Sequence, residues 1–205
     1  AAVVAGMGSG KTEQLKHTAQ SDQGQRKTFF LTHRRNLSRN VASRVGTIHY
    51  VQEGQVFDPR TGDELFGVVP ANGDATCVDS WHQGSALKRT ADELEGQRVV
   101  IDETDQVLDH LLRGATLQKQ RTQVLNTLHE GLPKTAQLVA ASGMLDEITL
   151  EWLESVSKRP VHLHRHTSES PRWSHCFVES EADALGQISA AIARGENVLI
   201  ATSDA

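Results

Sequence analysis

The sequence has few cysteines, no long apolar run and no excess of positive charge, and each absence narrows what the protein can be. Its two cysteines, Cys77 and Cys176, lack the spacing of a metal or redox site, which favours reduced thiols over a disulfide. No apolar stretch approaches the roughly 20 residues that a membrane span requires, and no signal peptide is recognisable. The formal net charge of -5 argues against passive coating of nucleic acid, although it permits a local basic groove. These features predict a cytoplasmic globular protein with no membrane partner.

What the chain does have is a glycine-rich turn near its start. A short apolar run ending at Ala5 is followed by Gly6-Met7-Gly8-Ser9-Gly10-Lys11-Thr12. Glycines let backbone N–H groups converge on a phosphate chain, Lys11 supplies charge for the β and γ phosphates, and Thr12 offers a hydroxyl to Mg²⁺. A helix beginning there would direct its positive dipole end at the phosphates. The segment predicts a P-loop, and a chance Gly-Ser-Gly-Lys-Thr loop is the alternative.

A second motif in the right order argues against that alternative. The β-branched run from Gln97 to Ile101 leads directly into Asp102-Glu103-Thr104-Asp105, an acid box. Apolar runs without clean alternation indicate strands covered on both faces, as in a parallel sheet with helices above and below. Ligands of such sheets bind at the carboxyl ends of the strands. We therefore expect an α/β fold in which the two motifs form one site.

Together the two motifs resemble motifs I and II of superfamily 2 helicases and translocases, in which an Ala-x-x-Gly-x-Gly-Lys-Thr loop precedes an Asp-Glu-x-Asp box. The resemblance implies a P-loop NTPase with a RecA-like parallel sheet flanked by helices, and ATP and Mg²⁺ as its ligands. It also implies that Asp102 holds Mg²⁺ through water and that Glu103 polarises the attacking water as general base. Lys11 would complete the catalytic set.

In these helicases the strand ends between the two motifs contact nucleic acid. His33-Arg34-Arg35 follows a predicted strand at the place of motif Ia and opens a predicted helix, which Asn36 or Ser38 is expected to cap. A solvated basic turn is the alternative. Ser80 and Trp81 follow another predicted strand at the place of the next contact motif. Trp81 is a candidate for stacking on a base, but packing in the core is the interpretation that we favour.

Two patterns follow the acid box. An apolar strand over Ala136 to Ala141 ends in Ser142-Gly143, which resembles motif III, the element that couples the ATP state to the nucleic-acid track. Ser142 is therefore a candidate to hydrogen-bond the Asp-Glu box. Further on, His162, His164 and His166 alternate along an extended segment. A zinc site is one interpretation, and an exposed polar strand face is the one that we favour.

A narrower resemblance comes from four short segments in order, which are Thr32 to Leu37, Cys77 to Ser80, Ile101 to Val107 and Ala140 to Leu145. They are similar to the helicase portion of cyanobacterial-type plasmid replication proteins, which are related to viral origin-binding helicases and often carry a primase-like region. This resemblance implies an ATP-dependent DNA helicase or translocase of plasmid or phage-like replication, with single-stranded or origin DNA as partner. The alternative is a nucleotide-dependent switch or packaging ATPase that acts on a protein. The oligomeric state is left open.

The expected domain organisation is a RecA-like ATP-binding lobe over residues 1–167, a linker over 168–172, and the truncated start of a second RecA-like lobe over 173–205. The last part is expected to contain a helix from about Glu181 to Arg194 with Gly195 as its stop. Because arginines of the second lobe complete the ATP site in the resembling helicases, we expect ATP hydrolysis in a longer parent protein and not in this chain alone.

Overall fold

The computed structural model describes residues 1–5, 11–20, 25–46, 49–52, 55–58, 60–66, 72–82, 84–85, 89–166 and 180–195. Contacts divide the chain into two units, Ala1–Ser168 and Glu169–Ala205. The Gly6 to Gly10 segment of the expected P-loop lies outside the described residues, and so does Cys176. Cys77 is a free, buried thiol, and burial raises its pKa to about 11. Its place agrees with the reduced state expected from the sequence.

The first unit is built on a nine-stranded sheet with the order β5-β4-β3-β6-β2-β7-β8-β1-β9. The strands from β3 to β9 in that order pair in parallel, and the hairpin strands β4 and β5 add antiparallel pairs at one edge. The strand bounds are β1 Ala2–Ala5, β2 Thr28–Thr32, β3 His49–Gln52, β4 Gln55–Phe57, β5 Glu64–Leu65, β6 Gly73–Cys77, β7 Arg98–Asp102, β8 Gln137–Ser142 and β9 Leu163–His166. The sequence-based expectation of an α/β fold with a mainly parallel sheet is thereby confirmed.

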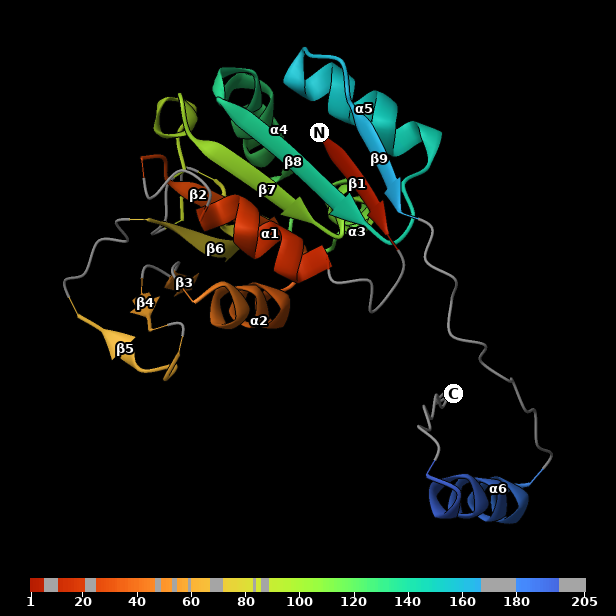
Figure 1. Ribbon diagram of the computed structural model, residues 1–205. Helices are drawn as coiled ribbons and strands as arrows, with labels where there is room; N and C mark the ends of the chain where they lie inside the picture. The colour runs from red at the N-terminus through yellow and green to blue at the C-terminus, as the bar shows by residue number, and fades with distance from the viewer. Residues whose placement is uncertain are drawn as a thin grey trace. The chain divides into compact units, whose positions relative to one another are not determined.

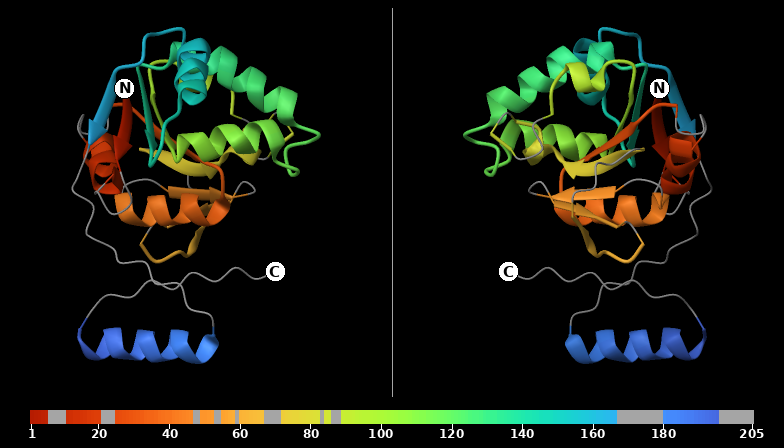
Figure 2. Two further views of the ribbon diagram at one scale, coloured as in Figure 1. Left: turned by 90° about the vertical axis from the view of Figure 1, so that its right-hand side faces the viewer. Right: turned by 90° about the vertical axis from the view of Figure 1, so that its left-hand side faces the viewer.

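Helices cover both faces of this sheet (Figures 1 and 2). Helices α1 and α2 lie on one face, and α3, α4 and α5 lie on the other. The helix bounds are α1 Lys11–Gln20, α2 Arg35–Val45, α3 Thr104–Arg113, α4 Arg121–Gly131 and α5 Glu147–Ser157, with short 3-10 turns η1 Val78–Ser80, η2 Asp92–Leu94 and η3 Leu132–Lys134. Each strand that carries a predicted motif is thus followed by a helix or turn at its carboxyl end.

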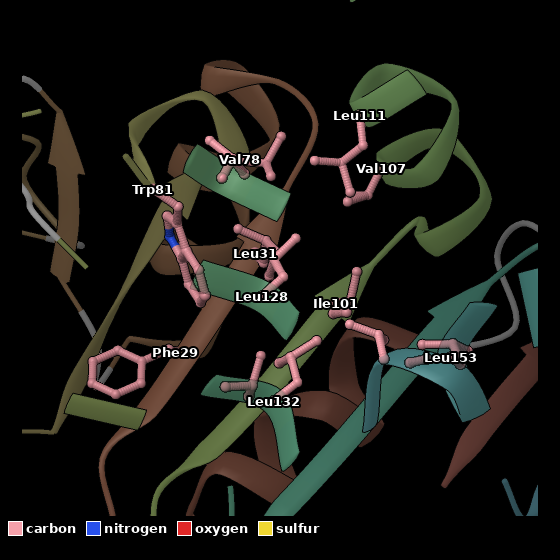
Figure 3. Close-up of a cluster of buried hydrophobic side chains, with 14 of the residues drawn as sticks. Phe29, Leu31, Val78, Trp81, Ile101, Val107, Leu111, Leu128, Leu132 and Leu153 are labelled. Carbon is pink, nitrogen blue, oxygen red and sulfur yellow. The ribbon is translucent and has the colours of Figure 1, made fainter. Parts of the chain in front are cut away.

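Alternation along the central strands supplies a separate core to each face. Phe29 and Leu31 of β2 pack in the cluster under α3, α4 and α5, whereas Phe30 points to the cluster under α1 and α2. Val100 of β7 likewise faces α1 and α2, between two neighbours that face the other way. Figure 3 shows the larger cluster, in which Leu111 and Leu128 bring two helices onto the sheet. Burial on both faces explains why these strands have continuous apolar sequences.

Polar side chains connect the strands near their amino ends, opposite to the carboxyl ends at which the predicted motifs lie. Arg98 at the start of β7 donates from Nε to Gln137 Oε1 of β8 at 2.6 Å and from Nη1 to Thr28 Oγ1 of β2 at 3.4 Å. Arg89 donates to both carboxylate oxygens of Asp74 at 2.8 and 2.7 Å. These buried, hydrogen-bonded charges join β7 to its neighbours β2 and β8, and hold the Arg89 segment on β6, near the amino ends of the strands.

Most element bounds agree with the sequence-based expectations, and α4 is the clearest exception. The apolar residues from Leu117 to Leu128 predict a helical segment over that range of the sequence, whereas α4 begins at Arg121. Leu117 is instead buried in the core, and its carbonyl accepts from the N–H groups of Gln120 and Arg121 in a tight turn. Leu117 fits the apolar pattern because it is buried, although it lies in a turn before the helix. An apolar pattern reflects burial, and burial does not require helical backbone geometry.

In the second unit the structure describes helix α6, Glu181–Ala193. The Ser180 hydroxyl caps it by accepting from the Asp183 N–H at 3.1 Å, and Gly195 follows with a φ of 74°. The predicted helix and its glycine stop are confirmed. The prediction that this segment begins a second RecA-like lobe stays a prediction. In the described part of the chain no helix is long and apolar enough to cross a membrane.

Candidate functional site

The carboxyl edge of the sheet brings Lys11 and the acid box together. Helix α1 begins at Lys11, directly after the glycine-rich part of the sequence that follows β1, and the acid box begins at the last residue of β7. Lys11 Nζ lies 3.9 Å from Glu103 Oε1. An alanine methyl placed at Gly143 would stand 3.8 Å from the same Nζ, so the turn after β8 also lies against Lys11. Three segments that are distant in sequence thus meet around one cation.

Asp102 is the most perturbed carboxylate of this site. Its side chain is 5% exposed. Burial, and after it the negative charge of Glu103, raise the pKa of Asp102 to about 6. The Glu103 N–H, Lys11 and Arg44 act in the opposite direction, because each favours the ionised form. A buried carboxylate that the protein compensates only in part is poised to gain from an added cation.

Glu103 adopts a backbone conformation that is unusual for its residue type. Its φ and ψ are 51° and 58°, in the left-handed region, and it forms the N-cap position of α3. Such a conformation costs a residue with a side chain on the order of 1–3 kcal/mol. Here it turns the chain sharply from β7 into α3 and directs the Glu103 carboxylate toward Lys11.

Two hydroxyls connect the acid box to the end of β8. Thr104 Oγ1 donates to the carbonyls of Ile101 and Ala141 at 3.1 and 3.2 Å. The Ser142 hydroxyl donates to the Asp105 carboxylate. The hydrogen bond that the sequence suggested between Ser142 and the Asp-Glu box is therefore present, and Asp105 is the residue that accepts it. The role of Ser142 and Gly143 in coupling stays a prediction.

A further cation reaches the site from α2, and sequence reasoning did not identify it. Arg44 Nη1 lies 3.5 Å from Thr12 Oγ1, within the range of a weak hydrogen bond. Arg44 also lowers the pKa of Asp102. No motif marks this residue, because its approach depends on the packing of α2 beside α1.

His33, Arg34 and Arg35 lie at the carboxyl end of β2, next to the acid box. Arg34 and Arg35 are exposed, and His33 is half-buried. Burial lowers the pKa of His33, and the charges of Arg34 and His110 lower it as well, while Asp105 raises it. The cap expected from Asn36 or Ser38 is wrong, because Arg34 occupies the N-cap position of α2 and no side chain makes a capping hydrogen bond there. Ser38 is buried, and its hydroxyl contacts Thr32 Oγ1 at 2.6 Å.

Trp81 belongs to the hydrophobic core, which corrects its inclusion among the nucleic-acid contacts. Its side chain is 0% exposed and lies among the apolar side chains of the larger cluster (Figure 3), and its indole N–H donates to Thr76 Oγ1 at 2.7 Å. With both ring faces covered, it has no surface on which a base could stack. The favoured packing interpretation describes its place. Ser80, at the end of η1, is partly exposed, and a contact with nucleic acid there stays a prediction.

A side-chain cluster beside α3 was also not foreseen. His110 Nε2 and Asp79 Oδ1 are 2.6 Å apart, and Thr116 Oγ1 donates to Asp79 Oδ2 at 2.8 Å. The cluster joins η1, α3 and the turn after α3. The three residues belong to separate segments with no spacing rule between them, so only the tertiary structure shows the cluster.

Of the alternating histidines, His164 and His166 lie on edge strand β9 and His162 directly precedes it, and His162 and His164 are exposed. Among the described residues no group of three or more His, Cys, Asp or Glu side chains is placed to hold a metal ion. The favoured interpretation of an exposed polar face agrees with this arrangement. A Mg²⁺ site of the expected kind needs fewer protein ligands, because Mg²⁺ keeps several waters and binds substrate phosphates beside one or two carboxylates.

Comparison with known proteins gives one sequence relative and a clear structural likeness. No family model matches the chain. An uncharacterized protein of Picosynechococcus sp. (strain ATCC 27264 / PCC 7002 / PR-6) is 27% identical over 211 residues, which covers 96% of this chain and 20% of that protein. The chain therefore spans about a fifth of the length of this relative.

Among solved structures, the chain is similar to the DEAD-box helicase Dbp5 of S. cerevisiae, in a complex with Nup159, Gle1, IP6 and ADP. The TM-score is 0.51 at 16% sequence identity, covering 82% of this chain and 43% of that one. At this identity the likeness concerns the fold. The first unit thus has a RecA-like α/β fold, with Lys11 and the acid box together at the carboxyl edge of its sheet.

Proposed function

We propose that this chain is the ATP-binding lobe of an ATP-dependent DNA helicase or translocase that acts in plasmid or phage-like DNA replication. The observation that carries the proposal is the approach of Lys11 to Glu103 at the carboxyl edge of a RecA-like sheet. Parallel sheets bind their ligands at this edge. A lysine at the start of a helix beside two acids, one of them buried, matches the needs of a Mg²⁺-bound triphosphate.

The residues present fit both ATP and Mg²⁺. For the nucleotide, Lys11 and the N-terminal N–H groups of α1 would meet the phosphates, with Gly6, Met7, Gly8, Ser9 and Gly10 forming the turn around them. For Mg²⁺, the raised pKa of Asp102 marks a carboxylate that an added cation would favour in its ionised form. Thr12 Oγ1 and Asp102 would hold the ion, which supplies charge stabilisation at the transferring phosphoryl group.

Each catalytic side chain has one task in this scheme. Glu103 would accept a proton from the attacking water, and its strained backbone fixes the carboxylate at the turn into α3. Lys11 would hold the β and γ phosphates through the charge that it now directs at Glu103. Separating Lys11 from Glu103 when phosphates arrive would leave the glutamate free to act as the base.

For the partner, the exposed Arg34 and Arg35 support contact with a nucleic-acid backbone at the edge where the acid box also lies. The link from Asp105 to Ser142 supports communication between the ATP site and that track. DNA as the partner, and replication as the process, rest on the resemblance to plasmid replication proteins. The Picosynechococcus relative is an uncharacterized protein, so it supports no particular activity for this chain.

The test is ATP hydrolysis by the full-length protein, measured with and without single-stranded DNA. Lys11→Ala should abolish hydrolysis, because no other side chain of the turn carries positive charge to the phosphates. Lys16→Ala is the matched control, since Lys16 lies on the same helix and pairs with Glu13 at the surface. Wild-type hydrolysis in the Lys11 variant would overturn the proposal. Hydrolysis that depends on Lys11 but does not respond to DNA would favour the switch or packaging ATPase instead.

A further inference from the structure

Next to the acid box, the described residues form an open groove of about 470 Å³. One wall is the turn after β2, with His33 and Arg34, and the other is helix α3. Asp105, Asp109 and Arg113 line the α3 wall. The groove therefore lies along the helix that follows the catalytic acids, and sequence reasoning assigned none of this wall to a ligand.

The groove combines partly buried polar side chains on its floor with exposed charges of both signs on its rim. His33 and Asp105 are partly buried, and Asp105 accepts from the Ser142 hydroxyl. Arg34 and Arg113 stand exposed on the two walls. Arg113 Nε pairs with Asp109 Oδ1 at 3.3 Å, with 81% and 63% of these side chains exposed, so water screens this pair and an incoming anion can compete for the arginine.

We infer that this groove binds the phosphodiester backbone of a single DNA strand, with Arg34 and Arg113 as its phosphate contacts from opposite walls. The inference rests on the proposed function and extends the nucleic-acid surface from the turn after β2 onto α3. A groove of this volume exceeds what a phosphate alone needs and leaves room for part of the attached nucleotide on the polar floor. Arginine suits the rim because its planar guanidinium binds phosphate oxygens in pairs.

Such a contact would connect the strand to hydrolysis by a short route. Arg113 ends the helix that Thr104 begins, and Glu103 occupies the N-cap position of that helix. Asp105, two residues after Glu103, is held by Ser142. A strand seated against α3 therefore acts on the element that carries the general base, and no intervening domain is required.

Two variants of one ion pair separate this role from a structural one. Arg113→Gln and Asp109→Asn both break the pair between these two residues, so a purely structural effect moves both in the same direction. A bound phosphodiester makes the directions opposite. Arg113→Gln should weaken binding of a fluorescein-labelled oligothymidylate and reduce the slope of log affinity against log salt by about 0.7, the value for one phosphate contact on a single strand. Asp109→Asn should tighten binding, by about threefold at low salt, because it removes a like charge from the rim.

The measurements use the full-length protein, with Lys119→Gln as control. Lys119 is exposed, lies near α3 in sequence and does not line the groove, so its loss should leave the salt slope unchanged. Hydrolysis without DNA should match the wild type in all three variants, while the DNA concentration for half-maximal stimulation should rise for Arg113→Gln and fall for Asp109→Asn.

Each outcome decides the matter. Opposite changes of DNA affinity in Arg113→Gln and Asp109→Asn support binding of the strand in the groove. Changes of the same sign, or no change, overturn it. If wild-type hydrolysis needs Lys11 and responds to DNA while both groove variants behave as wild type, only this inference fails. If the wild type binds no strand, the inference fails together with the proposed DNA partner.

Discussion

Asp102 carries a charge in a place that disfavours it, and the cost of that charge can be measured. The side chain is 5% exposed at the end of β7, and burial raises its pKa from 3.8 to about 6. One pKa unit corresponds to about 1.4 kcal/mol, so ionising Asp102 in the folded protein costs about 3 kcal/mol of stability above pH 6. Asp102→Asn keeps the shape and one acceptor oxygen for the Glu103 N–H. We therefore expect the variant to be more stable than the wild type at pH 7.5 by up to about 3 kcal/mol.

The pH dependence of the difference has a definite sign. Because the folded-state pKa is raised, the stability contributed by protonated Asp102 is fully present below pH 3.8 and is lost as the pH rises through about 6. The two proteins should therefore be equally stable near pH 3.8, should separate between there and pH 6, and should keep a constant difference above it. Urea unfolding across this range measures the difference directly.

The control is Asp109→Asn, which makes the same change of side chain at an exposed carboxylate. Adding Mg²⁺ and ATP should then stabilise the wild type more than the Asp102 variant, since the ion compensates the buried charge. A wild type that is as stable as Asp102→Asn at pH 7.5, or more stable, would refute the reasoning that the site is kept in a destabilised state for a cation.

Three further changes test other parts of the molecule. Glu103→Gln keeps its shape but removes the base, so ATP should still bind while turnover, measured under saturating ATP, falls by about 10² or more. Replacing Arg34 and Arg35 together by Ala should weaken single-strand binding for all sequences and flatten its salt dependence, and an unaltered slope would leave these residues as a solvated turn. Gly73→Ala should lower the free energy of unfolding by at least about 2 kcal/mol, read from urea midpoints, because Gly73 has a φ of 110° and an added Cβ would lie 2.0 Å from the Thr28 carbonyl oxygen. Wild-type stability in that variant would show that β6 shifts freely against β2.

Much of the fold could be predicted because local patterns and burial agree along the central strands. The β7 segment from Arg98 to Asp102 is apolar between its ends, is buried on both faces and ends in the acid box, so sequence and structure coincide. Helix α6 has both a serine cap and a glycine stop, which are short-range signals. At Leu117 the same apolar pattern misplaced a helix start, because burial there comes from a turn.

The candidate site was predictable where sequence motifs mark its residues, and not where only the packing of the fold brings residues together. Lys11 and Glu103 follow from motif order and the strand-end rule. Arg44 reaches Thr12 only because two helices lie side by side, and His110 meets Asp79 across three segments. For Trp81 the strand-end position suggested a surface, whereas its size and its bond to Thr76 place it inside. These features depend on distances through space, which the order of residues does not encode locally.

The contacts of Arg98 anchor β7 at its first residue, and Asp102 is the last residue of the same strand. Arg98 is tied to Gln137 and Thr28, whereas Asp102 at the other end has a raised pKa and incomplete compensation. Four residue steps at about 3.3 Å each separate Arg98 from Asp102. A tilt of the strand by about 4° around Arg98 would therefore displace the Asp102 carboxylate by about 1 Å. A misplacement of that size can alter an enzymatic rate by about 10²-fold. For the proposed ATP hydrolysis, a small reorientation of β7 would therefore be enough to change the rate markedly, without any large rearrangement of the sheet.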